Sequence, residues 1–368
     1  MDSFCPSRIE PTLNATVIVG SCFHPRRSTL RGGVRILFVI LCVLLIVPGW
    51  TGEERVWSYP PWLRVDTAPV VLDPDHPRRT RVGALTFLGG TALSSRVHGF
   101  GGFSAIAVAG DRFTLLGDGG TILRFRMGRD WRLHDVAGAD LPGGPGIGWD
   151  KSERDSESLV IDRSHDRAWI GFERANAIWR YSADLRVAQG QVAPPAMRRW
   201  PSNGGTEALA LLPDGRFVAI SEKAKMLRRL WAATDGARKQ SRQGLIFPRD
   251  PLDGIAPQRF AYMARPGFDV ADAAALPGGD LLVVERRFTL PYRFTTIVTR
   301  VGAADIRRGA VARPTIVATL AAPLVHDNIE GIAVTREGSA TILWLVADDN
   351  QSLLQRNLLL KFRLDQAP

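Results

Sequence analysis

Cysteine is scarce in this chain, and all three copies, Cys5, Cys22 and Cys42, lie ahead of residue 48. A disulfide framework and a thiolate metal site are therefore excluded from Pro48 onward. The serine-hydrolase, zinc-protease and phosphate-loop motifs GxSxG, HExxH and GxxxxGK[ST] are also missing. Histidine numbers only six in 368 residues. Any metal site in the main part of the chain is therefore expected to use oxygen ligands.

Long basic runs are absent too, although Lys and Arg number 47 against 37 Asp and Glu and give a net charge of +10. Arginine is spread as pairs, such as Arg78-Arg79 and Arg307-Arg308. Scattered pairs are typical of a solvated surface, so we expect no nucleic-acid partner. A hydrophobic content of 45% is that of a globular protein with a sizeable core, and we expect a monomer.

The only long apolar run covers residues 36–47 and carries no charge, and Arg26, Arg27, Arg31 and Arg35 precede it. A basic segment followed by an apolar one is the layout of a secretory signal. The run is short of the roughly 20 residues of a comfortable membrane span. The arginines predict that residues after Val47 lie outside the cytoplasm. No clear cleavage site follows, so a cleaved signal and a retained anchor both stay open.

These features predict four regions. Residues 1–35 form a basic, disordered N-terminal region, and residues 36–47 form a signal segment or membrane anchor. Residues 48–81 form a linker, and residues 82–368 form the folded domain. We expect a periplasmic or otherwise extracytoplasmic protein, tethered to the inner membrane if residues 36–47 are retained.

A short pattern recurs along the folded part at intervals of roughly 50–65 residues. A small or acidic residue opens a run of alternating small and aliphatic residues, and these openings are Ser104, Glu157, Glu207, Asp272 and Glu330. A turn and a second apolar run follow each opening, and the turns include strong hairpin signals such as Pro213-Asp214-Gly215. The second runs end in acids, at Asp118, Glu173, Glu222, Glu285 and the pair Asp348-Asp349.

Three or four short antiparallel strands per repeat are typical of propeller blades. The pattern predicts an all-β fold, a β-propeller of five to six blades. We favour six, with the sixth closed by strands near residues 82–94 together with chain-terminal segments. A β-sandwich with insertions is the alternative architecture.

Blade geometry predicts that the acids converge. The start of the first strand and the end of the second lie at the same edge of an antiparallel pair, and these edges face one end of the channel. The predicted ring contains Asp118, Glu157, Glu173, Glu207, Glu222, Asp272, Glu285, Glu330, Asp348 and Asp349. Four amides lie close to these acids in the sequence: Asn176, Asn203, Asn328 and Asn350.

So many carboxylates in a narrow mouth must stay partly protonated or be balanced by cations. Oxygen ligands without cysteine suit Ca²⁺, or else Mg²⁺ or another divalent ion. Lys223, Arg286 and Arg287 could instead pair with the acids internally. A structural ion without catalysis would explain the same residues. His326 precedes an acid-rich blade mouth, so it is a candidate functional residue as well as an ordinary surface one.

Three blocks taken together carry a family resemblance: GTEALALLPDGRF at 205–217, ALPGGDLLVVERRF at 275–288 and HDNIEGIAV at 326–334. Over roughly residues 83–364 the chain resembles the bacterial "esterase-like activity of phytase" family. The resemblance implies an exported propeller named for phosphoester or ester hydrolysis, in which Ca²⁺ held by channel carboxylates receives the substrate phosphate. It marks mouth carboxylates at Glu157, Glu207, Glu330 and Asp349. It also marks Glu285-Arg286-Arg287 as an acid with neighbouring cations. The chain departs from a symmetric acid ring at Ser104 and Asp272.

We therefore predict a metal-dependent phosphoric ester hydrolase that takes a small anionic or ester substrate. The predicted metal ligands are Glu157, Glu173, Glu207, Glu222, Asp272, Asn328, Glu330, Asp348 and Asp349. The predicted catalytic residues are Glu285, Arg286, Arg287, Lys223 and His326. A non-catalytic propeller that binds a ligand or partner, and a carboxylester or lactone hydrolase at the same mouth, are the alternatives.

Overall fold

The computed structural model describes residues 29–46, 58–147, 153–226, 235–291, 293–352 and 354–365. The chain divides into two compact units, Met1–Gly52 and Glu53–Pro368. In the first unit, helix α1 (Thr29–Ile46) contains most of the apolar run. None of the described helices has the combination of length and apolar character that crossing a membrane takes. The predictions for residues 1–28 and 47–57 lie outside the described residues.

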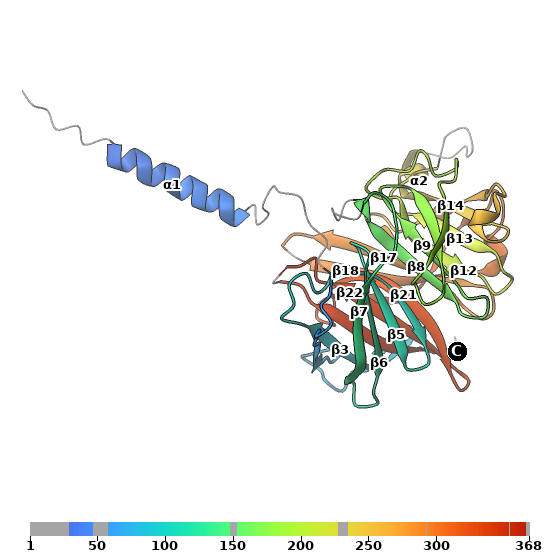
Figure 1. The fold of residues 1–368 in the computed structure, drawn as a ribbon, viewed down its shortest axis with the longest axis horizontal. Helices are drawn as coiled ribbons and strands as arrows, with labels where there is room; N and C mark the ends of the chain where they lie inside the picture. Colours follow the sequence, from blue (N-terminus) through green and yellow to red (C-terminus); the bar gives the residue numbers. More distant parts are fainter. Residues whose placement is uncertain are drawn as a thin grey trace, which may run out of the picture. The chain divides into compact units, whose positions relative to one another are not determined.

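The second unit is built from five sheets (Figure 1). Blade one holds β4 (Phe103–Ala109), β5 (Arg112–Gly117), β6 (Thr121–Met127) and β7 (Leu133–Asp140). Blade two holds β8 (Ser156–Asp162), β9 (Arg167–Phe172), β10 (Ala177–Tyr181) and β11 (Ala188–Val192). Blade three holds β12 (Thr206–Leu211), β13 (Phe217–Ser221), β14 (Ser241–Phe247), β15 (Gln258–Met263) and the short parallel strand β19 (Val311–Ala312).

Blade four holds β16 (Asp269–Ala275), β17 (Leu281–Thr289), β18 (Arg293–Val301) and β20 (Thr315–Leu320). Blade five joins the two ends of the unit. It holds β21 (Asn328–Glu337), β22 (Ala340–Asp348), β23 (Asn357–Leu364), β3 (Leu85–Ser94), β1 (Asp66–Pro69) and β2 (Arg81–Val82).

The preferred count of six blades is therefore wrong, and the reason lies in β3. This strand falls in the segment that was expected to close a sixth blade with chain-terminal segments. It does pair along most of its length with β23, but β23 belongs to the fifth sheet. The two ends of this unit thus close the fifth sheet, and no strand of the described residues remains for a sixth. The predicted linker also contributes to the propeller, because β1 pairs with β3 and Leu72 is buried in the core between blades four and five.

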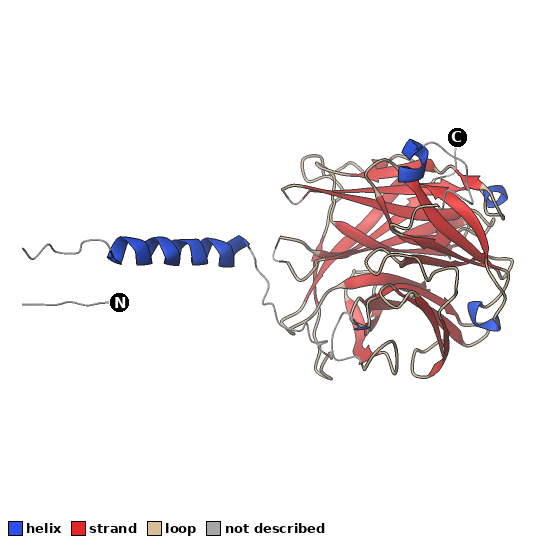
Figure 2. Cartoon of the chain, turned by 90° about the horizontal axis from the view of Figure 1, so that it is seen from above, coloured by secondary structure: helices blue, strands red, loops and turns tan. Residues whose placement is uncertain are grey.

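The five innermost strands, β4, β8, β12, β16 and β21, contact one another in a closed cycle. Buried apolar side chains of the described residues form five clusters, and each cluster lies between two consecutive blades. The hydrophobic effect thus holds blade against blade and leaves the axis free for polar side chains. Figure 2 shows strands as the bulk of this unit. Its described helical pieces are short: α2 (Asp235–Gln240), η3 (Pro251–Asp253) and η4 (Ala303–Asp305).

Small residues fill the innermost strands because these strands approach one another closely. Gly331 of β21 shows the constraint: a Cβ there would lie 2.8 Å from Val346 Cγ1 and 3.1 Å from the Cα of Ala105 in β4. The alternation of small and aliphatic residues in the sequence therefore reflects packing at the centre of the propeller.

Candidate functional site

Each innermost strand carries a β-bulge near its start, where one extra residue has no partner on the second strand. The bulged residues of blades one to five are Ser104, Glu157, Glu207, Ala271 and Glu330. Bulges re-aim side chains and are common next to functional sites. In this propeller they occur at the same place in every blade.

The second strands contribute an equivalent set. In each blade, the last inner-strand residue before the bulge pairs with a residue of the second strand. The next residue along that second strand is the counterpart of the bulged residue. These residues are Asp118, Glu173, Glu222, Arg286 and Asp348. Blade four thus has Ala271 at the bulge, where the other blades have Ser104 or a glutamate. It has Arg286 on the second strand, where the other blades have an acid.

These two sets meet around a cavity of about 330 Å³. Its described lining comprises Ser104, Asp118, Asp155, Glu157, Glu173, Arg174, Asn203, Glu207, Glu222, Lys223, Arg286, Glu330, Asp348 and Asn350. Eight of these side chains are carboxylates and three are cationic, so the formal excess is five negative charges. The structure therefore brings acids of four blades to one mouth, as the repeat predicted.

Arg286 lies among these acids and links blades three and five. Its Nη1 donates to Asn328 Oδ1 at 2.9 Å and pairs closely with Glu330 Oε1. Its Nη2 lies 3.4 Å from Glu222 Oε1. Burial alone would lower the pKa of Arg286, but Glu222, Glu207, Glu157 and Asp348 together raise it. The guanidinium therefore remains charged in this mouth.

Glu157 and Glu207 have no such partner, since neither forms an ion pair within the described part of the chain. Burial raises the pKa of Glu157 well above its ordinary value, and neighbouring Asp155, Asp118 and Glu173 raise it further. Burial likewise raises the pKa of Glu207, with Glu157, Glu222 and Glu173 adding to the shift. These carboxyls favour protonation unless a cation joins them.

Glu173 is held by the loop that leads into blade three. Its Oε1 accepts hydrogen bonds from the backbone N–H groups of Gly204 and Gly205, the latter at 3.2 Å. A Cβ at Gly205 would lie 2.8 Å from the carbonyl oxygen of Glu173 and would also meet Asn176 Oδ1. Glycine is therefore required for this approach. Burial raises the pKa of Glu173, although the bond from Gly204 opposes the shift.

Two groups of three carboxylates could each hold a metal ion, because each offers ligand oxygens within 4.8 Å of one another. One group is Asp155, Glu157 and Glu173, and the other is Glu173, Glu207 and Glu222. Both belong to blades two and three and share Glu173. The donors are oxygen throughout, which suits a hard divalent cation.

The two acids that the sequence predicted for blade four do not line the mouth. Asp272 follows the bulged Ala271, and its Oδ2 accepts a hydrogen bond from Ile332 N of the next blade at 2.9 Å. Glu285 is the partner of Val270, and its oxygens accept from Tyr262 Oη at 2.5 Å and Arg265 N at 2.7 Å. Both carboxylates therefore serve packing between strands and blades. The sequence pattern misplaced blade four because its acids stand one residue away from the mouth positions that the other blades use: Asp272 follows the bulged Ala271, and Glu285 precedes Arg286.

Of the other predicted residues, some lie at the cavity and others do not. Lys223 lines the cavity, with Nζ 2.6 Å from Glu222 Oε2, and Asn328 hydrogen-bonds both Arg286 and Glu330. Arg287 is exposed, with its guanidinium 4.7 Å from the Phe268 ring centroid.

His326 and Asp349 also lie off the cavity lining. His326 Nδ1 contacts Leu324 O at 2.7 Å, and Asp349 accepts from Asn357 Nδ2 at 2.8 Å. Neither arrangement supports the site roles that the sequence suggested.

Two further residues, Asp155 and Arg174, line the cavity without having been predicted, and they pair with each other at 3.0 Å. A local signal exists for both. Asp155 lies two residues before Glu157, and Arg174 directly follows Glu173.

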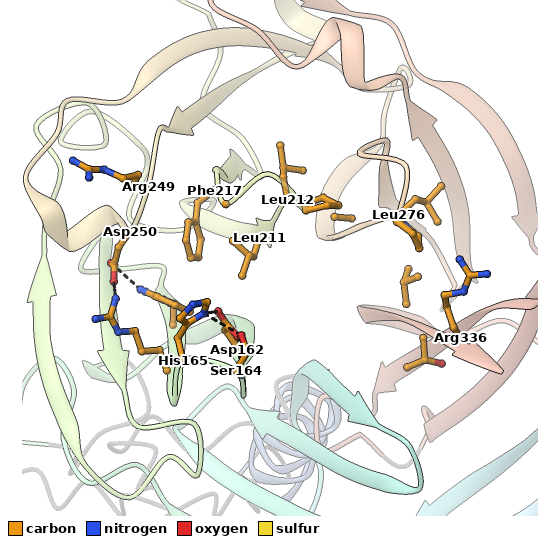
Figure 3. A pocket seen from close by; sticks show the side chains of 18 of the residues that line it. Asp162, Ser164, His165, Leu211, Leu212, Phe217, Arg249, Asp250, Leu276 and Arg336 are labelled. Carbon is orange, nitrogen blue, oxygen red and sulfur yellow. Dashed lines mark hydrogen bonds and ion pairs between the residues drawn. The ribbon is translucent and has the colours of Figure 1, made fainter. Parts of the chain in front are cut away.

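A larger cavity of about 780 Å³ lies at the other ends of the inner strands (Figure 3). Leu211, Leu212, Phe217 and Leu276 give it an apolar lining. Asp162, Ser164 and His165 meet in its wall, but Ser164 Oγ and Asp162 Oδ2 contact the same His165 nitrogen, Nδ1, at 3.0 and 2.6 Å.

A catalytic triad needs its serine and its acid on opposite ring nitrogens. This trio of Asp162, Ser164 and His165 is therefore a stabilised turn. The candidate site is the smaller, acid-lined mouth, because the reactive groups gather there.

The family model described as "Phytase-like: Esterase-like activity of phytase" matches residues 98–351. The chain belongs to this phytase-like family. The match takes in all five bulges and all five second-strand positions of the mouth. The mouth is thus part of the phytase-like domain.

No curated protein matches this phytase-like chain. Among solved structures, hydrazine synthase of Kuenenia stuttgartiensis is similar at 13% identity, with 71% of each chain covered and a TM-score of 0.37. A luciferin-regenerating enzyme is similar at 12% identity, with 82% of this chain and 98% of that chain covered and a TM-score of 0.39. Likeness at this level adds nothing to the assignment of function.

Proposed function

We propose that this phytase-like protein is a metal-dependent ester hydrolase whose substrates are phosphoric esters. One observation carries the proposal: eight carboxylates and three cationic side chains line one small cavity. With that charge the mouth repels a phosphate, so binding of an anionic substrate requires added cations. Family membership supports hydrolysis of an ester bond.

The donor set fits a divalent cation such as Ca²⁺ or Mg²⁺. Glu173 would hold it together with either Asp155 and Glu157 or Glu207 and Glu222. Ca²⁺ takes six to eight oxygen ligands, usually including carboxylates and water. A bound ion of this kind neutralises phosphate oxygens and lowers the pKa of a water molecule, so that a nucleophile is available at neutral pH.

The chain's own residues supply the rest of the chemistry. The pKa values of Glu157 and Glu207 are raised by burial and by neighbouring acids, so a divalent ion that binds them would displace protons from them. Lys223 is half-exposed at the rim, with its ammonium already beside Glu222, and Arg174 lies beside Asp155. These two cations would orient an incoming anion.

The proposed place of action is outside the cytoplasm. The support is the basic segment ahead of the apolar run at residues 36–47. A fusion of residues 1–60 to alkaline phosphatase tests this point in bacterial cells. Phosphatase activity is expected, and a fusion that is expressed but inactive would contradict export.

The test of the activity is a substrate panel with the purified full chain. p-Nitrophenyl phosphate, p-nitrophenyl acetate and a simple lactone are each assayed with EDTA, Ca²⁺, Mg²⁺ or Mn²⁺. Hydrolysis of the phosphate ester is expected with a divalent ion and not with EDTA. Turnover of only the acetate or only the lactone would show that the substrates are carboxylic esters or lactones and not phosphoric esters.

A matched pair of variants links activity to the mouth. Glu207→Gln removes a mouth carboxylate, and Glu337→Gln removes an exposed glutamate at the far end of β21 that pairs with Lys361. We expect Glu207→Gln to lose metal-dependent turnover and Glu337→Gln to keep it. Absence of turnover for every ester, with Ca²⁺ still bound, would favour a non-catalytic ligand-binding propeller.

A further inference from the structure

Blade four differs from the other blades at both mouth positions. Its bulged residue is Ala271, where three blades have glutamate, and its second-strand residue is Arg286, where four blades have an acid. The fold thus places one guanidinium at a position that is otherwise acidic. The side chain of Arg286 is only 22% exposed.

Both terminal nitrogens of Arg286 already have acceptors. Nη1 faces Asn328 and Glu330 of blade five, and Nη2 faces Glu222 of blade three. Glu330 also accepts from Asn328 Nδ2 at 2.6 Å. With its acceptors on two sides, the guanidinium is arranged to neutralise carboxylates of the mouth. A bidentate phosphate contact would require these bonds to break.

The mouth therefore has two electrostatically different sides. On one side, Arg286 neutralises Glu330 and shares Glu222 with Lys223. On the other side, Glu157 and Glu207 form no ion pair within the described residues. Both groups of carboxylates with metal-ligand spacing include Glu173 of this second side, and neither includes Glu330. One group also includes Glu222, so Arg286 lies at the edge of that group, beside its ion-paired member.

We infer that Arg286 is a built-in counter-cation that replaces a divalent ion beside blades four and five. It thereby confines divalent binding to the carboxylates of blades two and three. This inference shares with the proposed function the idea that the mouth binds cations, and it does not depend on hydrolysis. A single positive charge lowers the affinity of a neighbouring site for a divalent cation through direct repulsion.

The test is Ca²⁺ titration calorimetry and thermal unfolding of the full chain and three variants. Arg286→Gln removes the charge, and Arg286→Lys retains it. Arg287→Gln is the matched control, because this neighbouring guanidinium lies over the Phe268 ring and off the cavity lining.

Arg286→Gln is expected to bind Ca²⁺ at least about tenfold more tightly than the wild type. In EDTA its unfolding temperature is expected to be lower, with a larger gain on adding Ca²⁺. Arg286→Lys should bind within about threefold of the wild type, and Arg287→Gln should match the wild type. Equal or weaker binding by Arg286→Gln, or identical behaviour of the Lys and Gln variants, would overturn the inference.

If Arg286→Gln fails to fold even with Ca²⁺, the double variant Arg286→Gln/Glu330→Gln decides. Removing both members of a buried pair avoids an uncompensated charge, so the double variant is expected to fold. Failure of the double variant as well would show that Arg286 is needed for something other than charge balance.

The two proposals can fail separately. Tighter Ca²⁺ binding by Arg286→Gln, with a wild type that binds Ca²⁺ but hydrolyses no ester, would support the counter-cation and contradict metal-dependent hydrolysis. Metal-dependent turnover by the wild type, with unchanged Ca²⁺ affinity in Arg286→Gln, would support metal-dependent hydrolysis and contradict the counter-cation.

Discussion

Asp272 of β16 and Ile332 of β21 are joined by a hydrogen bond of 2.9 Å from the Ile332 backbone N–H to Asp272 Oδ2. The bond links blade four to blade five, and Asp272 is buried. Asp272 Oδ1 also accepts from Ala273 N at 2.7 Å. This carboxylate therefore holds two blades together, although the sequence repeat presents it as one more acid of the mouth.

Replacing Asp272 with alanine should cost stability and leave metal binding intact. The Ile332 N–H would lose its buried acceptor, which costs about 1–3 kcal/mol. Chemical denaturation measures this loss, and Ca²⁺ titration of the same variant is expected to give the wild-type affinity. Loss of Ca²⁺ binding in a variant that remains folded would show that Asp272 contributes to the cation site of the mouth.

Glu285→Gln should behave in the same way. Tyr262 Oη and Arg265 N both donate to the buried Glu285 carboxylate, and the amide can accept from only one side. We expect a loss of about 1–3 kcal/mol in the free energy of unfolding. Turnover per folded molecule should be unchanged. A folded variant without activity would show that Glu285 acts in catalysis.

Glu157→Gln and Glu207→Gln should weaken Ca²⁺ binding by at least about tenfold each, because each removes a carboxylate from the unneutralised side of the mouth. In EDTA the variants should be no less stable than the wild type, since each relieves repulsion among carboxylates. Calorimetry and thermal unfolding check both parts. Unchanged Ca²⁺ affinity in both variants would show that the cation binds at a site other than these carboxylates.

Gly205→Ala should disturb the mouth through the backbone. The added Cβ would lie 2.8 Å from the carbonyl oxygen of Glu173, so the loop that donates to Glu173 must shift. Overpacking of this kind costs about 1–3 kcal/mol. Gly215→Ala is the control, because a Cβ there meets nothing within 4 Å, although its φ of 88° adds strain of its own. Ca²⁺ affinity should fall in Gly205→Ala and hold in Gly215→Ala.

Stability without metal should depend on pH in a direction set by the mouth. The pKa values of Glu157, Glu173 and Glu207 are raised, so the folded chain binds protons that the unfolded chain has released. Their contribution to stability is complete below the ordinary value of 4.5 and is lost as pH rises through the raised values. Exposed acids with lowered pKa, such as Asp214, act oppositely and only near and below 3.8.

In EDTA the unfolding temperature should therefore be higher at pH 5 than at pH 8. Saturating Ca²⁺ at pH 8 should recover the part of the difference that comes from the mouth, and Glu207→Gln should reduce the slope. Buried Asp272 and Glu285, whose pKa values are also raised, contribute the rest. Differential scanning calorimetry across this range measures the effect. A metal-free protein that gains stability steadily from pH 5 to pH 8 would contradict the raised pKa values.

Much of the fold could be predicted from the repeat. The alternation of small and aliphatic residues marks the inner strands because the inner strands approach too closely for larger side chains. The blade count missed by one. Residues 82–94 were expected to close a blade with chain-terminal segments, and β3 does pair with β23, but both strands belong to the sheet of β21 and β22 and not to a sixth sheet.

The mouth could be predicted in the blades where the acid that opens the sequence repeat is also the bulged residue, as at Glu157, Glu207 and Glu330. It failed in blade four, where the pattern aligns Asp272 and Glu285 but the bulge places Ala271 and Arg286 at those positions. A shift of one residue along a strand turns a side chain to the opposite face. Hydrophobic periodicity alone does not locate a bulge, so the basic residue at the mouth was assigned beside the ring and not within it.

The most direct test of the account is Ca²⁺ titration calorimetry of the metal-stripped full chain beside Glu207→Gln. We expect saturable binding by the wild type and binding weakened at least about tenfold by the substitution. No binding of Ca²⁺, Mg²⁺ or Mn²⁺ by the wild type, with an unfolding temperature unmoved by all three, would contradict a cation-binding mouth.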